Sequence, residues 1–118
     1  MDFSFKIEEK KDYTVLNFTG NLIEKSQAIA MFDKFDELLS RDVNKFVVNM
    51  SGFGYMNSTG LNTLITILTK ARKAGGEAVV CCVPENIKSL LVITKLNNIF
   101  NVAASEEEAA GSLMKAVS

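Results

Sequence analysis

The chain has 118 residues, which indicates a single domain over residues 1–118 with enough length to bury a hydrophobic core. Its composition, 47% hydrophobic and 23% charged, is ordinary for a globular protein. The 13 basic and 14 acidic residues give a net charge of −1, which argues against a nucleic-acid-binding protein, since such proteins usually carry a basic face.

The first half of the chain predicts two strands, a helix and a third strand. Apolar and polar residues alternate over residues 3–8, and residues 13–19 are rich in β-branched and aromatic side chains, so we expect an antiparallel hairpin. Ser26 is the expected N-cap of a helix whose apolar residues recur at helical spacing. Residues 45–50 predict a buried strand, and residues 52–56, which include two glycines, predict a loop.

The second half of the chain predicts three more helices and two strands. We expect a helix over residues 59–74 that is ended by Gly75-Gly76. Residues 78–83 are an apolar run, typical of a strand that is covered on both faces. Pro84 is expected to start a third helix, and residues 99–102 a short last strand.

A final helix is expected after its N-cap, Ser105. Its first turn carries three solvated acidic residues that suit the positive end of the helix dipole: Glu106, Glu107 and Glu108. Its expected inward-facing residues are Leu113, Met114 and Val117. The complete order, β-β-α-β-α-β-α-β-α, predicts an α/β fold with a mixed, mostly parallel sheet of about five strands and four helices packed against it.

The sequence contains no histidine, so the commonest general base and the commonest transition-metal ligand are both missing. This excludes a Ser-His-Asp or Cys-His hydrolase and argues against a zinc site. We expect neither a metal nor a cofactor. Residues 1–12 lack the apolar stretch of a signal peptide, and no apolar run is long enough to span a membrane, so no membrane association is expected.

Two cysteines, Cys81 and Cys82, are adjacent in the predicted strand 78–83. Consecutive strand residues point to opposite faces of a sheet. We therefore expect two small buried side chains that form no disulfide with each other.

The most informative segment is Met56-Asn57-Ser58-Thr59-Gly60-Leu61, where the expected loop meets the second helix. Asn57 is a suitable N-cap, and Ser58 and Thr59 place hydroxyl groups in the first turn, where backbone N–H groups point outward. Such a turn can hold a phosphate. It lacks the glycine-rich run followed by Lys-Ser/Thr of a P-loop, which argues against nucleotide hydrolysis. From the pattern alone, a plain helix cap is the simpler interpretation.

The large apolar side chains of residues 52–56 leave two alternatives open. Loops lie at protein surfaces. Phe53, Tyr55 and Met56 therefore either fold back over the core or form a partner-binding patch beside Ser58.

Three segments, in order and at fitting spacings, resemble the motifs of the STAS domain, in particular those of stand-alone bacterial anti-sigma factor antagonists. Phe18-Thr19-Gly20-Asn21-Leu22 is similar to a strand that ends in Gly-x-Leu. Tyr55-Met56-Asn57-Ser58-Thr59-Gly60-Leu61 is similar to the family's phosphorylation motif, Asp-Ser-Ser/Thr-Gly-Leu, after an apolar pair. Residues 90–100 are similar to its third helix, Leu-x-x-Thr-Gly-Leu followed by Phe. The resemblance covers nearly the whole chain.

Two positions depart from the family pattern. Asn57 stands where the phosphorylation motif usually opens with Asp, and it keeps the capping oxygen without the charge. Ile23 stands where the Gly-x-Leu segment is usually followed by Asp, and it keeps neither. Lys95 in place of Gly is a milder change at a helix end.

The resemblance implies a non-enzymatic regulatory domain of the bacterial cytoplasm that works by partner switching. The unmodified protein would bind an anti-sigma factor that is also a serine kinase, and would so release a sigma factor. Phosphorylation of Ser58 would break the complex, and a PP2C-like phosphatase would restore it. The expected partner-binding residues are Leu22, Ile23, Glu24, Phe53, Tyr55, Met56, Asn57 and Thr59. The expected oligomeric state is a monomer or weak dimer.

Two alternatives stand beside this hypothesis. The first keeps the fold without the switch, as a STAS scaffold or a regulator that binds a small ligand, and the departures at Ile23 and Asn57 favour it. The second is a small α/β enzyme with Ser58 as nucleophile. The absence of histidine and of an obvious lysine base near Ser58 argues against the enzyme.

Overall fold

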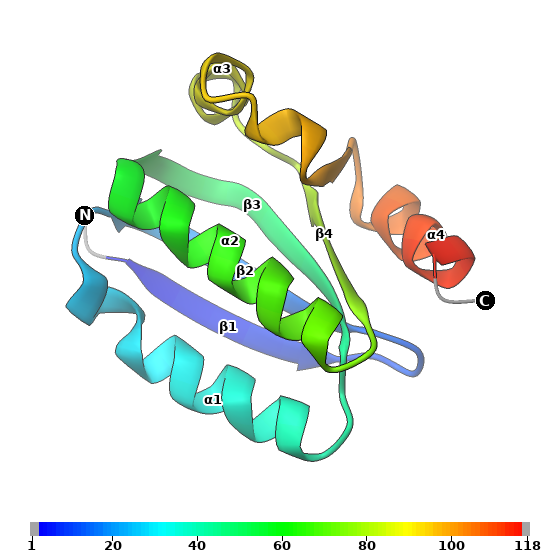
Figure 1. Cartoon of the computed structure of the whole chain (residues 1–118). Coiled ribbons are helices and arrows are strands. Elements are labelled where there is room, and N and C mark those ends of the chain that lie inside the picture. Colours follow the sequence, from blue (N-terminus) through cyan, green and yellow to red (C-terminus); the bar gives the residue numbers. More distant parts are fainter. Residues whose placement is uncertain (1–2, 117–118) are drawn as a thin grey trace.

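The computed structural model describes residues 3–116, which form one five-stranded sheet in the order β1-β2-β3-β4-β5 (Figure 1). Strand β1 (Ser4–Glu9) pairs antiparallel with β2 (Thr14–Leu22). The next pairings, through β3 (Lys45–Met56), β4 (Glu77–Cys81) and β5 (Asn101–Ala103), are parallel. The predicted α/β class, with a mixed and mostly parallel sheet, is confirmed.

Helices cover the two faces of this sheet unequally (Figure 1). Three helices pack over the larger core: α1 (Ile29–Ser40), α2 (Ser58–Lys73) and α3 (Glu85–Ile93). This core contains most of the large buried side chains, among them Phe18, Phe35, Phe46, Met50 and Leu91. The last helix, α4 (Glu106–Ala116), lies on the opposite face and covers a smaller core made of Val15, Val47, Val79, Cys81, Ala109 and Leu113. Within residues 3–116, no helix is both long and apolar enough to cross a membrane.

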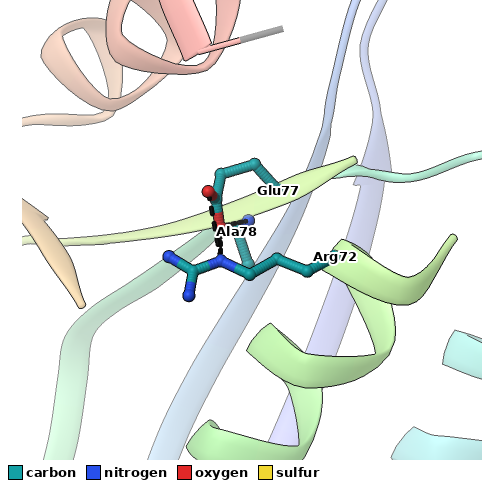
Figure 2. A network of polar contacts seen from close by, with 3 residues as sticks. All are labelled: Arg72, Glu77 and Ala78. Carbon is teal, nitrogen blue, oxygen red and sulfur yellow. Dashed lines mark hydrogen bonds and ion pairs between the residues drawn. The ribbon is translucent and has the colours of Figure 1, made fainter. Parts of the chain in front are cut away.

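The end of α2 that lies far from Ser58 is fixed to β4, as Figure 2 shows. Arg72 Nε donates to both carboxylate oxygens of Glu77, at 2.9 and 3.2 Å, and Glu77 Oε1 also accepts from the backbone N–H of Ala78 at 3.1 Å. Just beyond the helix, Gly75 adopts a φ of 86°, which glycine tolerates without strain. The predicted helix end at Gly75-Gly76 is therefore confirmed.

The two central strands are longer than predicted. Strand β2 continues beyond Gly20 to Leu22, and residues 52–56, predicted as a loop, form the second half of β3. The pairing of β2 with β3 shifts register between Asn17 and Thr19 and again between Gly20 and Asn21. Such bulges let paired strands continue through glycine-containing segments.

Two details of the predicted helices are also corrected, and a third lies outside the described residues. Ser26 is not the N-cap of α1, because it lies inside a 3₁₀ turn (Lys25–Ala28) that precedes the helix. Met114 is 42% exposed, because α4 turns Leu113 rather than Met114 toward the sheet. Val117, expected to face inward, lies outside the described residues.

Candidate functional site

The candidate site lies where β3 ends and α2 begins. Asn57 has an extended backbone between the two elements, and its Oδ1 accepts hydrogen bonds from the backbone N–H groups of Thr59, at 3.0 Å, and Gly60, at 3.3 Å. Its Nδ2 donates to the carbonyl oxygen of Ile23 at 3.1 Å. One side chain therefore caps α2 and ties it to the turn that follows β2. The predicted N-cap is confirmed.

Ser58 is the first residue of α2, and it is exposed to solvent. Its position in the first turn of the helix agrees with the prediction. The first turn of α2 carries no acidic residue, so no carboxylate in this turn opposes a negative group at Ser58. The positive end of the helix dipole and the outward backbone N–H groups favour an anion there. Ser58 is thus placed at a helix end that favours a negative group.

Gly60 lets the beginning of α2 lie directly on the ends of β2 and β3. A Cβ atom at this position would lie 2.5 Å from Cβ of Met56 and 2.8 Å from the carbonyl oxygen of Leu22. Both distances are far inside normal contact, and one of them involves backbone that cannot move aside. Glycine at this position therefore fixes how close the Ser58 turn sits to the sheet.

The turn after β2 forms the other half of the site. Gln27 Oε1 accepts hydrogen bonds from the backbone N–H groups of Ile23 and Glu24, both at 2.9 Å. Gln27 Nε2 donates to the carbonyl oxygen of Asn21 at 3.3 Å. Glu24 and Gln27 form a capping box that starts the 3₁₀ turn. Together with the hydrogen bond from Asn57, these contacts hold Ile23 beside the start of α2.

Three of the predicted partner-binding residues have buried side chains, which corrects the prediction that these side chains contact a partner. Leu22 and Met56 are fully buried and Phe53 is 5% exposed, so their side chains belong to the larger core. Leu22 pairs with Met56 across β2 and β3. The ring of Phe53 packs against those of Phe3 and Phe18. These three residues support the site from beneath and present no side chain to a partner.

The other predicted contact residues remain accessible. Ile23 is 43% exposed and Tyr55 is 54% exposed, Glu24 is exposed, and Asn57 and Thr59 are half-buried. Of the three large apolar side chains in residues 52–56, Phe53 and Met56 thus fold into the core, while Tyr55 lies outside it. We call the accessible set the Ser58 surface, and it consists of Ile23, Glu24, Tyr55, Asn57, Ser58 and Thr59.

A groove next to the Ser58 surface was not predicted. It has a volume of about 590 Å³ and lies between α2 on one side and the 3₁₀ turn with α1 on the other, with Thr59 in its wall. Lys70, also in the wall, pairs with Asp36 at 2.8 Å and lies 5.2 Å from the centre of the Phe32 ring. A polar stripe at helical spacing on α2 could have indicated it: Thr59, Asn62, Thr63 and Thr66. Within residues 3–116, no cluster of three or more His, Cys, Asp or Glu side chains could hold a metal ion.

The family model of the STAS domain matches residues 4–109. A protein of Bordetella bronchiseptica named "Putative anti-sigma factor antagonist BtrV" is 27% identical to the chain over 109 residues, which are 92% of this chain and 94% of that protein.

Solved structures share the fold. An anti-sigma factor antagonist from Mycobacterium paratuberculosis superposes with a TM-score of 0.81 at 16% identity, covering 96% of this chain and 95% of the other. The Bacillus cell fate determinant SpoIIAA, in its phosphorylated form, superposes with a TM-score of 0.71 at 16% identity, covering 92% of this chain and 98% of the other.

Proposed function

Because the chain belongs to the STAS domain family, we propose that it is an anti-sigma factor antagonist whose binding is switched by phosphorylation of Ser58. In this function it is a binding protein rather than an enzyme. Its unmodified form binds an anti-sigma factor with serine kinase activity and thereby releases a sigma factor. A PP2C-like phosphatase returns the phosphorylated form to the binding state.

The observation that carries this proposal is the place of Ser58. Ser58 is exposed at the N-terminus of α2, next to the turn after β2 that contains the accessible Ile23 and just beyond the accessible Tyr55 of β3. The names of the relatives support the class of partner: BtrV is named as an antagonist of this kind, and SpoIIAA is a structural neighbour that exists in a phosphorylated form.

The physical basis of the switch is local. A phosphate adds about −1.5 to −2 charges at neutral pH, and its bulk would stand in the middle of a protein interface. The helix N-terminus stabilises an exposed anion by roughly 0.3–1 kcal/mol, so the modified domain keeps its fold. Asn57 repels this phosphate less than the usual Asp of the motif would.

The first test compares Ser58→Asp with Ser58→Ala. Both variants should unfold close to wild type, because Ser58 is exposed. Ser58→Asp should lose binding to the anti-sigma kinase encoded by the same organism, whereas Ser58→Ala should bind it and accept no phosphate. Intact-mass measurement after incubation with that kinase and ATP, followed by fragmentation, locates the phosphate. Phosphate found only on Thr59, or a Ser58→Asp protein that binds as tightly as wild type, would contradict the switch.

A second test addresses the Ser58 surface. Ile23→Ala and Tyr55→Ala should each weaken binding of the same kinase, because each removes an accessible apolar side chain at the centre of the proposed interface. Ile93→Ala is the matched control, since Ile93 is 76% exposed on α3 and lies outside this surface. Melting temperatures of all three should stay near wild type. Equal binding by Ile23→Ala, Tyr55→Ala and wild type would place the interface elsewhere.

The groove favours one alternative function, a STAS regulator that binds a small ligand. Its wall combines the apolar ring of Phe32 with the hydroxyl groups of Thr63 and Thr66. Its charged groups are the ammonium groups of Lys25 and of Lys70, which pairs with Asp36, and the carboxylate of Asp33. A ligand of this function would have both an apolar part and an anionic part. If Ser58 carries no phosphate either in protein isolated from its own host or after incubation with the kinase and ATP, this alternative replaces the switch.

A further inference from the structure

The strand pattern predicts that the two adjacent cysteines point to opposite faces of the sheet, but in the structure they do not. Strand β4 ends at Cys81, and Cys82 adopts a left-handed backbone conformation with a φ of 59°. This conformation breaks the alternation of side chains, and the two Sγ atoms lie 3.3 Å apart. The expectation that the two side chains lie on opposite faces is therefore wrong, and both cysteines are free thiols.

The two thiols have different surroundings. Cys81 is fully buried in the smaller core, and burial first, then the nearby Cys82 thiol and Glu106, raise its pKa to about 12. Cys82 is half-buried at the edge of the same core, and its backbone N–H donates to the carbonyl oxygen of Ala103 at 3.3 Å. Solvent thus reaches Cys82 more easily than Cys81.

We propose that Cys81 and Cys82 form a vicinal dithiol that small-molecule disulfides oxidise reversibly to an intramolecular disulfide. The Cys82 thiolate attacks one sulfur of the oxidant, whose S–S bond breaks, and a mixed disulfide forms as the first small thiol leaves. Cys81 then attacks the Cys82 sulfur, so the S–S bond between the two cysteines forms and the mixed S–S bond breaks. The second small thiol leaves with the proton from Cys81. In total the two protein thiols lose two electrons and two protons, and the oxidant gains them.

The order of the two cysteines follows from their surroundings. The thiolate is the attacking form, and at neutral pH a pKa of about 12 keeps Cys81 protonated. Cys82 therefore reacts with the oxidant first. Cys81 then needs no diffusion, because its sulfur already lies beside that of Cys82.

The covalent geometry indicates that the disulfide is easily reduced. Adjacent Cα atoms lie about 3.8 Å apart across a trans peptide bond, whereas disulfide-bonded Cα atoms are usually at least about 4.4 Å apart. A disulfide in this eight-membered ring is strained, and strained disulfides are the labile ones. The site is therefore suited to reversible modification and not to permanent cross-linking.

The test treats the reduced full-length protein with oxidised glutathione at neutral pH and measures intact mass. Wild type should lose the mass of two hydrogen atoms, remain a monomer on a non-reducing gel, and return to its original mass with dithiothreitol. Cys81→Ala should instead keep one glutathione on Cys82, and Cys82→Ala should stay unmodified. Wild type that retains glutathione, stays fully reduced or forms a covalent dimer would overturn the proposal. Circular dichroism melting confirms that both variants fold.

A second probe tests the geometry without oxidation. Phenylarsine oxide bonds to two thiols only when they lie close together. Wild type should bind one equivalent, lose both thiols to titration and recover them only with a dithiol. In either single-cysteine variant, a monothiol should be enough to release the arsenical and recover the thiol. If a monothiol released the arsenical equally from wild type and from the variants, the two sulfurs would not be adjacent in solution, and this would overturn the site.

Discussion

Asn57 shows how one residue both builds the site and sets its charge. Its side chain makes three hydrogen bonds, two into the first turn of α2 and one to the turn after β2. The two bonds into α2 need only an oxygen, so an Asp could make them. The third needs an amide N–H, which an ionised Asp lacks. Asparagine therefore adds a tie between β2 and α2 and removes a charge next to Ser58.

This double role predicts different outcomes for two substitutions. Asn57→Ala should lower the free energy of unfolding by about 1–2 kcal/mol, because two backbone N–H groups lose their cap. Asn57→Asp keeps the cap and should cost less than about 1 kcal/mol, the net value of the lost bond to Ile23. Urea unfolding followed by circular dichroism measures both. If Asn57→Asp were as unstable as Asn57→Ala, the bond to Ile23 rather than the cap would hold α2.

At the scale of the elements, periodicity and capping signals predicted most of the structure, although the cap expected at Ser26 and the inward face expected for Met114 were wrong. The order of strands and helices, the cap at Asn57 and the helix end at Gly75 were predicted from such patterns. These signals are local, because each depends on residues within one or two turns.

The errors in the strands lie where contacts between neighbouring strands determine the structure. Gly52 and Gly54 suggested a loop, yet in β3 they make room for side chains of β2: a Cβ atom would lie 2.6 Å from Thr19 Cγ2 and from Asn21 Oδ1, respectively. The left-handed conformation of Cys82 likewise has no signal in the sequence. Such features depend on which strands are neighbours in the sheet, and a single sequence does not reveal this pairing.

The close approach of α2 to the sheet gives a prediction at this scale. Gly60→Ala should lower the free energy of unfolding by about 1–3 kcal/mol, since the new methyl group overlaps Met56 and the Leu22 carbonyl. Gly111→Ala in α4 is the matched control, because nothing lies within 4 Å of its added Cβ. That control should gain roughly 0.5–1 kcal/mol from helix propensity. Thermal and urea unfolding compare the two; similar changes for both would contradict the close packing at Gly60.

For the whole molecule, the helices on the two faces of the sheet enclose two cores that support different sites. The larger core, under α1, α2 and α3, supports the Ser58 surface through the buried residues Leu22, Phe53 and Met56. The smaller core, under α4, contains the cysteine pair. The two cores share the strands between them, because neighbouring residues of β2 and β3 point alternately into each. A change in one core should therefore affect the stability of the other.

This coupling predicts that the molecule unfolds as one cooperative unit. Leu113 is fully buried under α4, so Leu113→Ala should lower the free energy of unfolding by about 2–4 kcal/mol. Met114→Ala, which truncates a neighbouring side chain that is 42% exposed, should change it by less than about 1 kcal/mol. Urea unfolding measures both values. In native-state hydrogen exchange, the most protected amides of β2 and α2 should lose the same free energy in Leu113→Ala as the whole protein does. Loss of protection confined to α4 and the strands beneath it would instead mean that α4 detaches on its own, and the Ser58 surface would then be independent of the face that holds the cysteines.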